Sequence, residues 1–201
     1  MYKVLKNIKF LFEFVRCIFH LLIFYRSKNN SLIREDINRW LFILNKKYNT
    51  TTGLIYLLAF HKAFRNIFYY RIGVLKYILN IYCPQISSLI IQTEHIGGGL
   101  FIWHGFGTGI GAKSIGKNCT INQMVVIGNS KGYPTILDNV SIQAGAVIVG
   151  NITIGNNTII GTNTTVLTDI PDNCTVFPAS SRIMKWKRTL PDTTKFESYV
   201  D

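Results

Sequence analysis

The sequence predicts an α+β fold in which a helical N-terminal region precedes a coil of short parallel strands. In residues 3–20 the polar positions are spaced by three or four, as along one face of a helix. From Ile96 onward, aliphatic residues recur every six positions instead. A period of six that persists over many repeats requires a chain that turns a corner after each one. The charge divides the chain into the same two regions.

The basic residues are concentrated in the first region. The chain has 201 residues and a formal net charge of +12. Residues 1–87 hold 14 Lys and Arg against 3 acids, whereas residues 88–201 hold 8 against 7. The basic residues alternate with a wide apolar face instead of lining a polar groove, which argues against nucleic-acid binding. No run of about 18 uncharged apolar residues occurs, so we expect no membrane-spanning helix.

Cysteine and histidine usage limits the choice of cofactor and compartment. The four cysteines stand far apart and form no C-x-x-C pair: Cys17, Cys83, Cys119 and Cys174. This spacing is unlike a metal knuckle or a disulfide framework. The repeat region has only His95 and His104, too few for a three-histidine metal site. Glu13 and Arg16 interrupt the apolar N-terminus, which makes a poor signal peptide. We therefore expect a reduced, cytoplasmic protein that needs no metal.

The helices are predicted from the spacing of polar residues and from residues that typically begin or end a helix. Residues 3–20 form one helix with a narrow polar stripe and a very wide apolar face. Ser31 indicates a second helix start, and residues 54–79 predict a third helix that breaks near Gly73. Pro84 ends the helical region. The apolar face of the first helix must be covered, either by helices of an assembly or by an anionic membrane surface that attracts its basic residues. Both alternatives remain open at this stage.

The six-residue period predicts strands separated by corners. Gly and Asn follow many of the aliphatic positions, and both residues turn the backbone at little steric cost. Three sides close a triangular prism whose successive coils pair as parallel strands, with the aliphatic side chains inside. The period is broken twice, by one extra residue between Ile102 and Ile115 and by three between Ile127 and Ile136.

The repeat region resembles the hexapeptide-repeat acyltransferases, and most of all their serine acetyltransferase branch. Three segments carry this resemblance: Ile-Gly-Gly-Gly-Leu-Phe-Ile-Trp-His (96–104), Ile-Gly-Asn-Ser-Lys-Gly (127–132) and Val-Leu-Thr-Asp-Ile-Pro-Asp-Asn (166–173). The helical segment Phe-Arg-Asn-Ile-Phe-Tyr-Tyr-Arg (64–71) is similar to acetyltransferases of capsule and surface-polysaccharide synthesis.

The resemblance implies a left-handed parallel β-helix at residues 88–184, which forms a homotrimer and binds acetyl-CoA between neighbouring subunits. Residues 1–87 are then a helical region for assembly, membrane association or both. Residues 185–201 form a C-terminal tail.

The resemblance assigns the role of general base to His104. The same residue stands at the first break of the six-residue period, in a segment rich in glycine. An imidazole titrates near neutral pH, so it can accept the proton of a hydroxyl that attacks a thioester. Backbone N–H groups of this loop are the expected donors to the oxyanion. The family carboxylate that orients the histidine aligns near Leu89, which leaves Glu94 as the nearest acid and a weak candidate for that role.

Two departures from the serine acetyltransferases affect the expected acceptor. Those enzymes have a carboxylate just before the histidine and Arg-His-Pro in a later loop, whereas this chain has Trp103 and Gly132-Tyr133-Pro134. A tryptophan suits the apolar face of a sugar ring, or equally a subunit interface. We therefore expect Trp103 and Tyr133 to bind a saccharide, and the protein to acetylate a hydroxyl of a bacterial capsular or other surface polysaccharide or its precursor. The alternatives are serine acetylation for cysteine synthesis and a non-catalytic trimeric scaffold.

The expected acetyl-CoA site consists of small residues and a basic end. The family segments G-A-G-A and G-A-x-S appear as residues 143–146 and 161–164, where small side chains leave room for the pantetheine arm. Basic residues beyond the repeats can pair with the CoA phosphates, although a solvated basic tail is the alternative. The expected cofactor-binding residues are Ala144, Gly145, Ala146, Gly161, Thr162, Thr164, Arg182 and Lys185.

Overall fold

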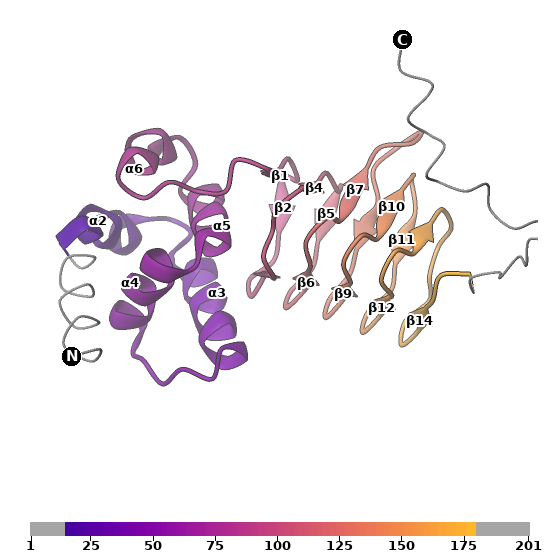
Figure 1. Ribbon diagram of the computed structural model, residues 1–201, viewed down its shortest axis with the longest axis horizontal. Helices are drawn as coiled ribbons and strands as arrows, with labels where there is room; N and C mark the ends of the chain where they lie inside the picture. The colour runs from indigo at the N-terminus through magenta and orange to yellow at the C-terminus, as the bar shows by residue number, and fades with distance from the viewer. Residues whose placement is uncertain (1–14, 180–201) are drawn as a thin grey trace, which may run out of the picture.

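A computed structural model describes residues 15–179 and shows helices at one end and a parallel β-solenoid at the other (Figure 1). It confirms the predicted order of a helical region followed by hexapeptide coils. The helical elements are α2 (Ile18–Arg26), α3 (Asn30–Ile43), α4 (Thr50–Phe60), α5 (Lys62–Ile72), the 3-10 helix η1 (Gly73–Leu75) and α6 (Lys76–Tyr82).

The helix boundaries differ from the predicted ones at two places. Residues 3–14 of the first predicted helix lie outside the described residues, and α2 continues to Arg26, six residues beyond the predicted end. The predicted helix over residues 54–79 is interrupted at His61 as well as at Gly73, where φ is +64°. His61 has extended backbone angles and lies between α4 and α5. No Gly or Pro marks that break, so the sequence contains no local signal for it.

The solenoid has three parallel sheets, one on each side of the prism. The sheet orders are β1-β4-β7-β10-β13, β11-β8-β5-β2 and β14-β12-β9-β6-β3. Its strands are β1 (Leu89–Ile91), β2 (His95–Ile96), β3 (Phe101–Ile102), β4 (Thr108–Ile110), β5 (Ser114–Ile115), β6 (Thr120–Ile121), β7 (Val126–Gly128), β8 (Thr135–Ile136), β9 (Ser141–Ile142), β10 (Val147–Val149), β11 (Thr153–Ile154), β12 (Ile159–Ile160), β13 (Thr165–Val166) and β14 (Thr175–Val176).

The aliphatic positions of the repeat stack inside the prism, as predicted. Ile115 pairs with Ile136, which pairs with Ile154, and all three side chains are buried. One row of corners is made by asparagines with φ between 55° and 59°, a left-handed conformation that Asn tolerates better than most residues. The corner residues are Asn118, Asn139, Asn157 and Asn173. Neighbouring corners are joined by side-chain hydrogen bonds, such as the 3.1 Å bond that Asn139 donates to Asn157.

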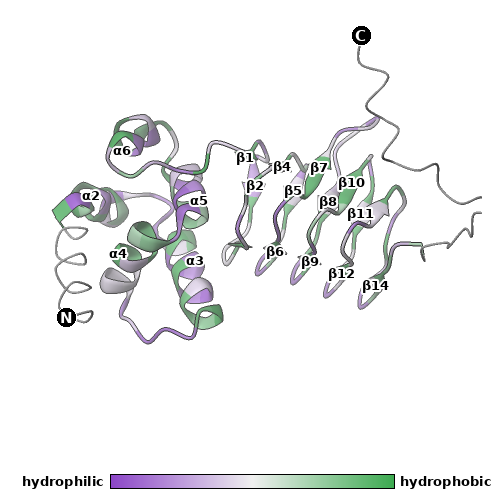
Figure 2. Ribbon diagram, in the orientation of Figure 1, coloured by the Kyte–Doolittle hydropathy of each residue, from purple (hydrophilic) through white to green (hydrophobic). Residues whose placement is uncertain are grey.

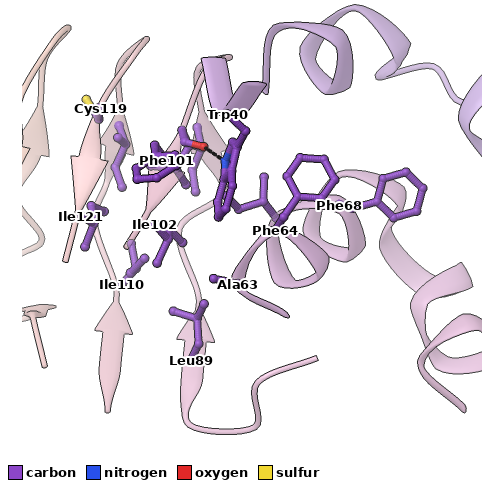
Figure 3. Packing of buried hydrophobic residues seen from close by; sticks show 14 of the residues in the cluster. Trp40, Ala63, Phe64, Phe68, Leu89, Phe101, Ile102, Ile110, Cys119 and Ile121 are labelled. Atoms are coloured by element: carbon purple, nitrogen blue, oxygen red, sulfur yellow. Dashed lines mark hydrogen bonds between the residues drawn. The ribbon is translucent and has the colours of Figure 1, made fainter. Parts of the chain in front are cut away.

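The helices pack directly on the first coil, and the two regions share one hydrophobic core. Trp40 of α3 lies between Phe64 of α5 and Phe101 of β3, with ring centroids 5.4 and 4.4 Å away (Figure 3). The indole N–H of Trp40 donates a 2.9 Å hydrogen bond to the carbonyl of Leu100. The buried indole therefore keeps its polar atom satisfied while it joins helix to solenoid.

The opposite end of the helical region exposes apolar side chains. α2 and α6 lie there, away from the solenoid, and both carry hydrophobic segments (Figure 2). The ring centroids of Phe19 and Tyr82 are 6.4 Å apart, so the two helices present one continuous surface. We call this surface the α2–α6 face; its exposed residues are Ile18, Phe19, Leu22, Tyr25, Tyr77, Ile78, Ile81 and Tyr82. None of the helices in the described part of the chain has the length and hydropathy to span a membrane.

Candidate active site

The first break of the six-residue period holds His104 in a strained turn. Ile102 and Ile110 are consecutive inward positions on neighbouring sides of the coil, yet eight residues separate them instead of six. The extra residues form a loop in which the N–H of Gly105 donates a 2.9 Å hydrogen bond to the carbonyl of Trp103. His104, at φ +66°, is the central residue of this γ-turn. The positive-φ form of that turn is rare and strained, and such residues concentrate at functional sites.

His104 faces a hollow between the helices and the first coil. The hollow has a volume of about 350 Å³. It is lined by Trp40, Leu44, Phe60, His61, Lys62, Ala63, Ile86, Phe101, Ile102, Trp103 and His104. The imidazole of His104 is exposed and lies 5.4 Å, centroid to centroid, from the indole of Trp103. An exposed base in a mainly apolar hollow is able to contact a small acceptor, which fits proton abstraction from a hydroxyl.

His61 is a second histidine of this hollow, and it lies at the break between α4 and α5, inside the range 54–79 that the sequence predicts as one helix. Burial, with a smaller contribution from Lys46, holds the pKa of His61 below its ordinary value. The ring packs against Trp40 and Tyr56. The extended backbone between α4 and α5 brings the side chain here, and only the break between those helices would have signalled it. His61 therefore lines the hollow as a neutral group at neutral pH.

No carboxylate lines the hollow among the described residues. Leu89, at the position where the family carries its orienting carboxylate, is buried on β1. A methyl group at Gly105 would lie 3.0 Å from the Leu89 side chain, so Leu89 is next to the His104 turn. Glu94 instead borders two other hollows, where it lies with Tyr70 and with Lys113. The structure thus does not bring Glu94 into the hollow of His104, and it provides no support for an orienting role within one subunit.

Two of the loop N–H groups expected to bind the oxyanion already donate hydrogen bonds to other atoms of the chain. The N–H of Gly105 donates to Trp103, and that of Gly107 donates to the hydroxyl of Ser88 at 3.3 Å. Both bonds stabilise the turn that holds His104. Donors to an oxyanion therefore have to come from other groups.

The two residues predicted to bind the acceptor lie in different hollows. Trp103 borders the hollow of His104 and is 42% exposed. Tyr133 lies within the second break of the period and borders a separate hollow of about 360 Å³ with Gln92, Lys113 and Asn151. The structure therefore groups Trp103 with His104 within one chain, and it leaves Tyr133 apart from them.

The predicted cofactor residues lie on later coils, and several are required by the coil itself. The side chains of Ala146 and Thr164 are buried in the solenoid, so neither can present its side chain to a ligand. A methyl group at Gly145 would collide with the side chain of Asn163, and one at Gly161 would lie 2.9 Å from the carbonyl of Val176. Coil stacking alone therefore requires these glycines. Ala144 and Thr162 are accessible, whereas Arg182 and Lys185 lie outside the described residues.

Comparison with known proteins identifies the class of the solenoid. Residues 133–168 match the sequence profile of the bacterial transferase hexapeptide family (six repeats). Residues 133–168 of the β-solenoid therefore carry the hexapeptide repeat of that transferase family.

The similar proteins are serine acetyltransferases. That of Synechococcus elongatus is 35% identical over 138 residues, which cover 63% of this chain and 55% of that protein. That of Staphylococcus xylosus is 40% identical over 121 residues, 55% of this chain and 56% of that protein. The chain spans little more than half the length of these curated relatives.

Solved structures give the same result. Entamoeba histolytica serine acetyltransferase 1 in complex with L-cysteine has a TM-score of 0.55 at 27% identity, with 72% of this chain and 63% of that chain covered. The Neisseria gonorrhoeae serine acetyltransferase in complex with serine has a TM-score of 0.56 at 25% identity, with 77% and 68% covered. The covered shares are larger than residues 88–201, so both alignments extend into the helical region.

These relatives contradict the predicted polysaccharide activity. The prediction gave more weight to Trp103 and Tyr133 than to the rest of the repeat, yet the relatives are named for serine at 35–40% identity. The departures of Trp103 and Tyr133 from the serine acetyltransferase pattern agree with altered recognition of the same acceptor, serine. The alternative of serine acetylation is therefore better supported.

Proposed function

We propose that this protein is an acetyl-CoA-dependent O-acetyltransferase that transfers the acetyl group to the hydroxyl of L-serine, with His104 as general base. One observation carries the proposal: the only strained non-glycine turn of the first coil directs an exposed imidazole into a hollow, on a solenoid similar to serine acetyltransferases. Direct transfer requires no metal. It also requires no acyl-enzyme, because the hydroxyl attacks the thioester while His104 accepts its proton.

The charged groups of the proposed acceptor hollow differ from those of a site that binds both charged groups of a free amino acid. Among the described residues that line it, Lys62 is the one Lys, Arg, Asp or Glu, and its ammonium group suits the serine carboxylate. No acid is available there for the serine amino group among the described residues. We therefore propose Trp103 and Lys62 as acceptor-binding residues. We expect this site to favour zwitterionic serine only weakly over hydroxyl compounds that lack its charges.

We also propose a homotrimer with acetyl-CoA between neighbouring solenoids, residues 88–184 as the transferase part and 1–87 as the assembly part. Phe106 and Met124 support this arrangement because both are more than half exposed beside the His104 turn. The N–H of Met124 donates to the carbonyl of Phe106, so the two residues occupy one apolar corner. The α2–α6 face contacts either a neighbouring subunit or an anionic membrane surface, and both alternatives stay open.

An acceptor assay tests the proposed function. Purified protein is incubated with acetyl-CoA and L-serine, release of CoA is followed with a thiol reagent, and O-acetylserine is identified by mass spectrometry. We expect CoA release that depends on serine, and D-serine and L-alanine serve as controls. Acetyl transfer to no hydroxyl amino acid would refute serine as the acceptor, and a protein unable to bind acetyl-CoA would favour the scaffold alternative.

A further inference from the structure

Two cysteines far apart in sequence meet beside a histidine inside the helical region. Cys17 directly precedes α2 and Cys83 directly follows α6, and the two are 66 positions apart in the sequence. His20 lies in the first turn of α2. All three side chains have an exposed fraction of 0%. Their possible ligand atoms, one from each residue, all lie within 4.8 Å of one another.

The separation of the two sulfur atoms matches a shared metal ion. They are 3.8 Å apart, well beyond the roughly 2.05 Å of a disulfide bond. Two thiolates bound to zinc at about 2.3 Å and at the tetrahedral angle place their sulfurs roughly 3.8 Å apart. The backbone ends of α2 and α6 therefore already hold the thiols at the spacing of a coordinated pair.

The histidine is oriented as a metal ligand would be. Its Nε2 lies 3.0 Å from the hydroxyl of Tyr69, and that hydroxyl donates to the carbonyl of Cys83 at 2.7 Å. Tyr69 therefore accepts the Nε2–H of His20, which fixes the tautomer and leaves the lone pair on Nδ1. This Nδ1 is buried and has no hydrogen-bond partner in the described part of the chain. Metal-binding histidines commonly donate their other ring N–H to a partner in this way.

Zinc binds cysteine as the thiolate, so the thiols of Cys17 and Cys83 would release their protons as the ion binds.

We propose that Cys17, His20 Nδ1 and Cys83 bind one zinc-class divalent ion, which fastens the start of α2 to the end of α6. Two thiolates and an imidazole are a ligand set that zinc favours, and a water or small thiol completes the tetrahedron. The ion has no part in acetyl transfer, because the cluster lies in the helical region and His104 lies on the first coil. Its effect is to hold α2 in place and so to maintain the α2–α6 face.

Cobalt substitution of the full-length protein tests the site without any variant. The protein is purified under a non-thiol reductant, freed of metal and titrated with Co²⁺. We expect one Co²⁺ per chain with thiolate-to-cobalt charge-transfer absorption in the near ultraviolet, which an equimolar amount of Zn²⁺ removes. A reduced chain that shows no such absorption refutes the proposal. A chain that instead joins Cys17 to Cys83 in a disulfide, and never binds Co²⁺, likewise refutes it and indicates a redox pair.

Variants assign the ligands. Tyr69→Phe keeps all three ligands but removes the hydroxyl that contacts His20 and donates to the carbonyls of Leu79 and Cys83, so we expect Co²⁺ affinity to fall by about 10- to 100-fold. Cys83→Ser and His20→Phe remove a ligand itself and are expected to reduce affinity by more than that. Cys119→Ser is the matched control, because Cys119 is also buried but lies on the solenoid; its Co²⁺ affinity should equal that of the unaltered chain. Equal losses in Cys83→Ser and Cys119→Ser would contradict the assignment.

Discussion

Asp36 of α3 and Arg71 of α5 form a buried ion pair in which Oδ2 and Nε lie 2.9 Å apart. Asp36 also accepts the backbone N–H groups of Gly99 and Leu100, at 2.8 and 3.1 Å, and Arg71 donates to the carbonyl of Gly97 at 2.6 Å. Two helices are thus joined to the corner between β2 and β3. Burial raises the pKa of Asp36 above its ordinary value, although Arg71 and the two N–H donors oppose that shift.

We expect Arg71→Met to destabilise the protein by about 3–5 kcal/mol at pH 7, because it leaves the Asp36 carboxylate buried without its counter-ion. Urea unfolding followed by circular dichroism measures the loss. A carboxyl with a raised pKa contributes stability that is present below the unfolded value near 3.8 and is lost as pH rises through the folded value. The defect should therefore be smaller at acidic pH. Lys131→Met, at an exposed position, is the control; an equal effect in both variants would contradict the role of the pair.

We expect His104→Ala to fold normally and to reduce acetyl transfer by about 10²–10⁴-fold, the usual loss when a general base is removed. CoA release under saturating serine measures the change in kcat. His95→Ala is the matched control, since His95 is exposed on another side of the solenoid. Near-normal turnover in the His104 variant would show that another group accepts the proton.

We expect Trp103→Asp to increase the efficiency with L-serine, because it restores the carboxylate that serine acetyltransferases carry before the histidine. A hydrogen bond to a charged group contributes about 1.5–3 kcal/mol, which corresponds to roughly a 10- to 150-fold fall in KM. Steady-state kinetics with varied serine give the measurement. Trp103→Phe keeps an aromatic ring and should leave KM nearly unchanged. If Trp103→Asp weakens serine binding instead, the lost indole contact outweighs the added carboxylate and the prediction is wrong.

We expect the protein to lose stability as pH falls below about 6.5, in part through His61. Its folded-state pKa is lowered, so its contribution is present above the unfolded value and is lost as pH falls through the folded value. Melting temperatures measured from pH 8 to pH 5 should fall less steeply for His61→Gln than for the unaltered chain. His95→Gln should keep the original slope. Parallel curves for all three proteins would show that His61 does not contribute.

We expect substitutions on the α2–α6 face to show whether that face contacts a membrane or a neighbouring subunit. Deleting residues 1–25 would also remove buried Phe24 and His20, so surface substitutions are the sharper test. If the face binds membrane, Leu22→Ser with Ile81→Ser should abolish flotation with anionic liposomes at low salt and leave the oligomer intact. If it binds a neighbouring subunit, the same variant should dissociate in sedimentation while the unaltered protein never floats. Phe42→Ser, exposed on α3, is the control.

The solenoid was predictable from sequence because its period is local. The inward aliphatic positions recur every six residues along the chain, and Asn118 and Asn139 turn corners through their own backbone preferences. His104 was predictable because the period is broken there. The places of His61 and Cys83 in their sites were not predictable. Their roles depend on contacts with distant segments, such as the 66-residue separation of Cys17 and Cys83, and no local pattern encodes those contacts.

The helices cover the first coil of the solenoid and so give the prism two unlike ends. An uncovered coil offers unpaired backbone groups to another copy of the chain, which is how solenoids polymerise. Trp40 and Phe64 close that end, at the same coil that holds His104. Duplication of an 18-residue unit beyond the first coil would therefore lengthen the prism and leave the loop of His104 in its place against the helices. The height of the solenoid can thus vary in evolution without a change at the covered end.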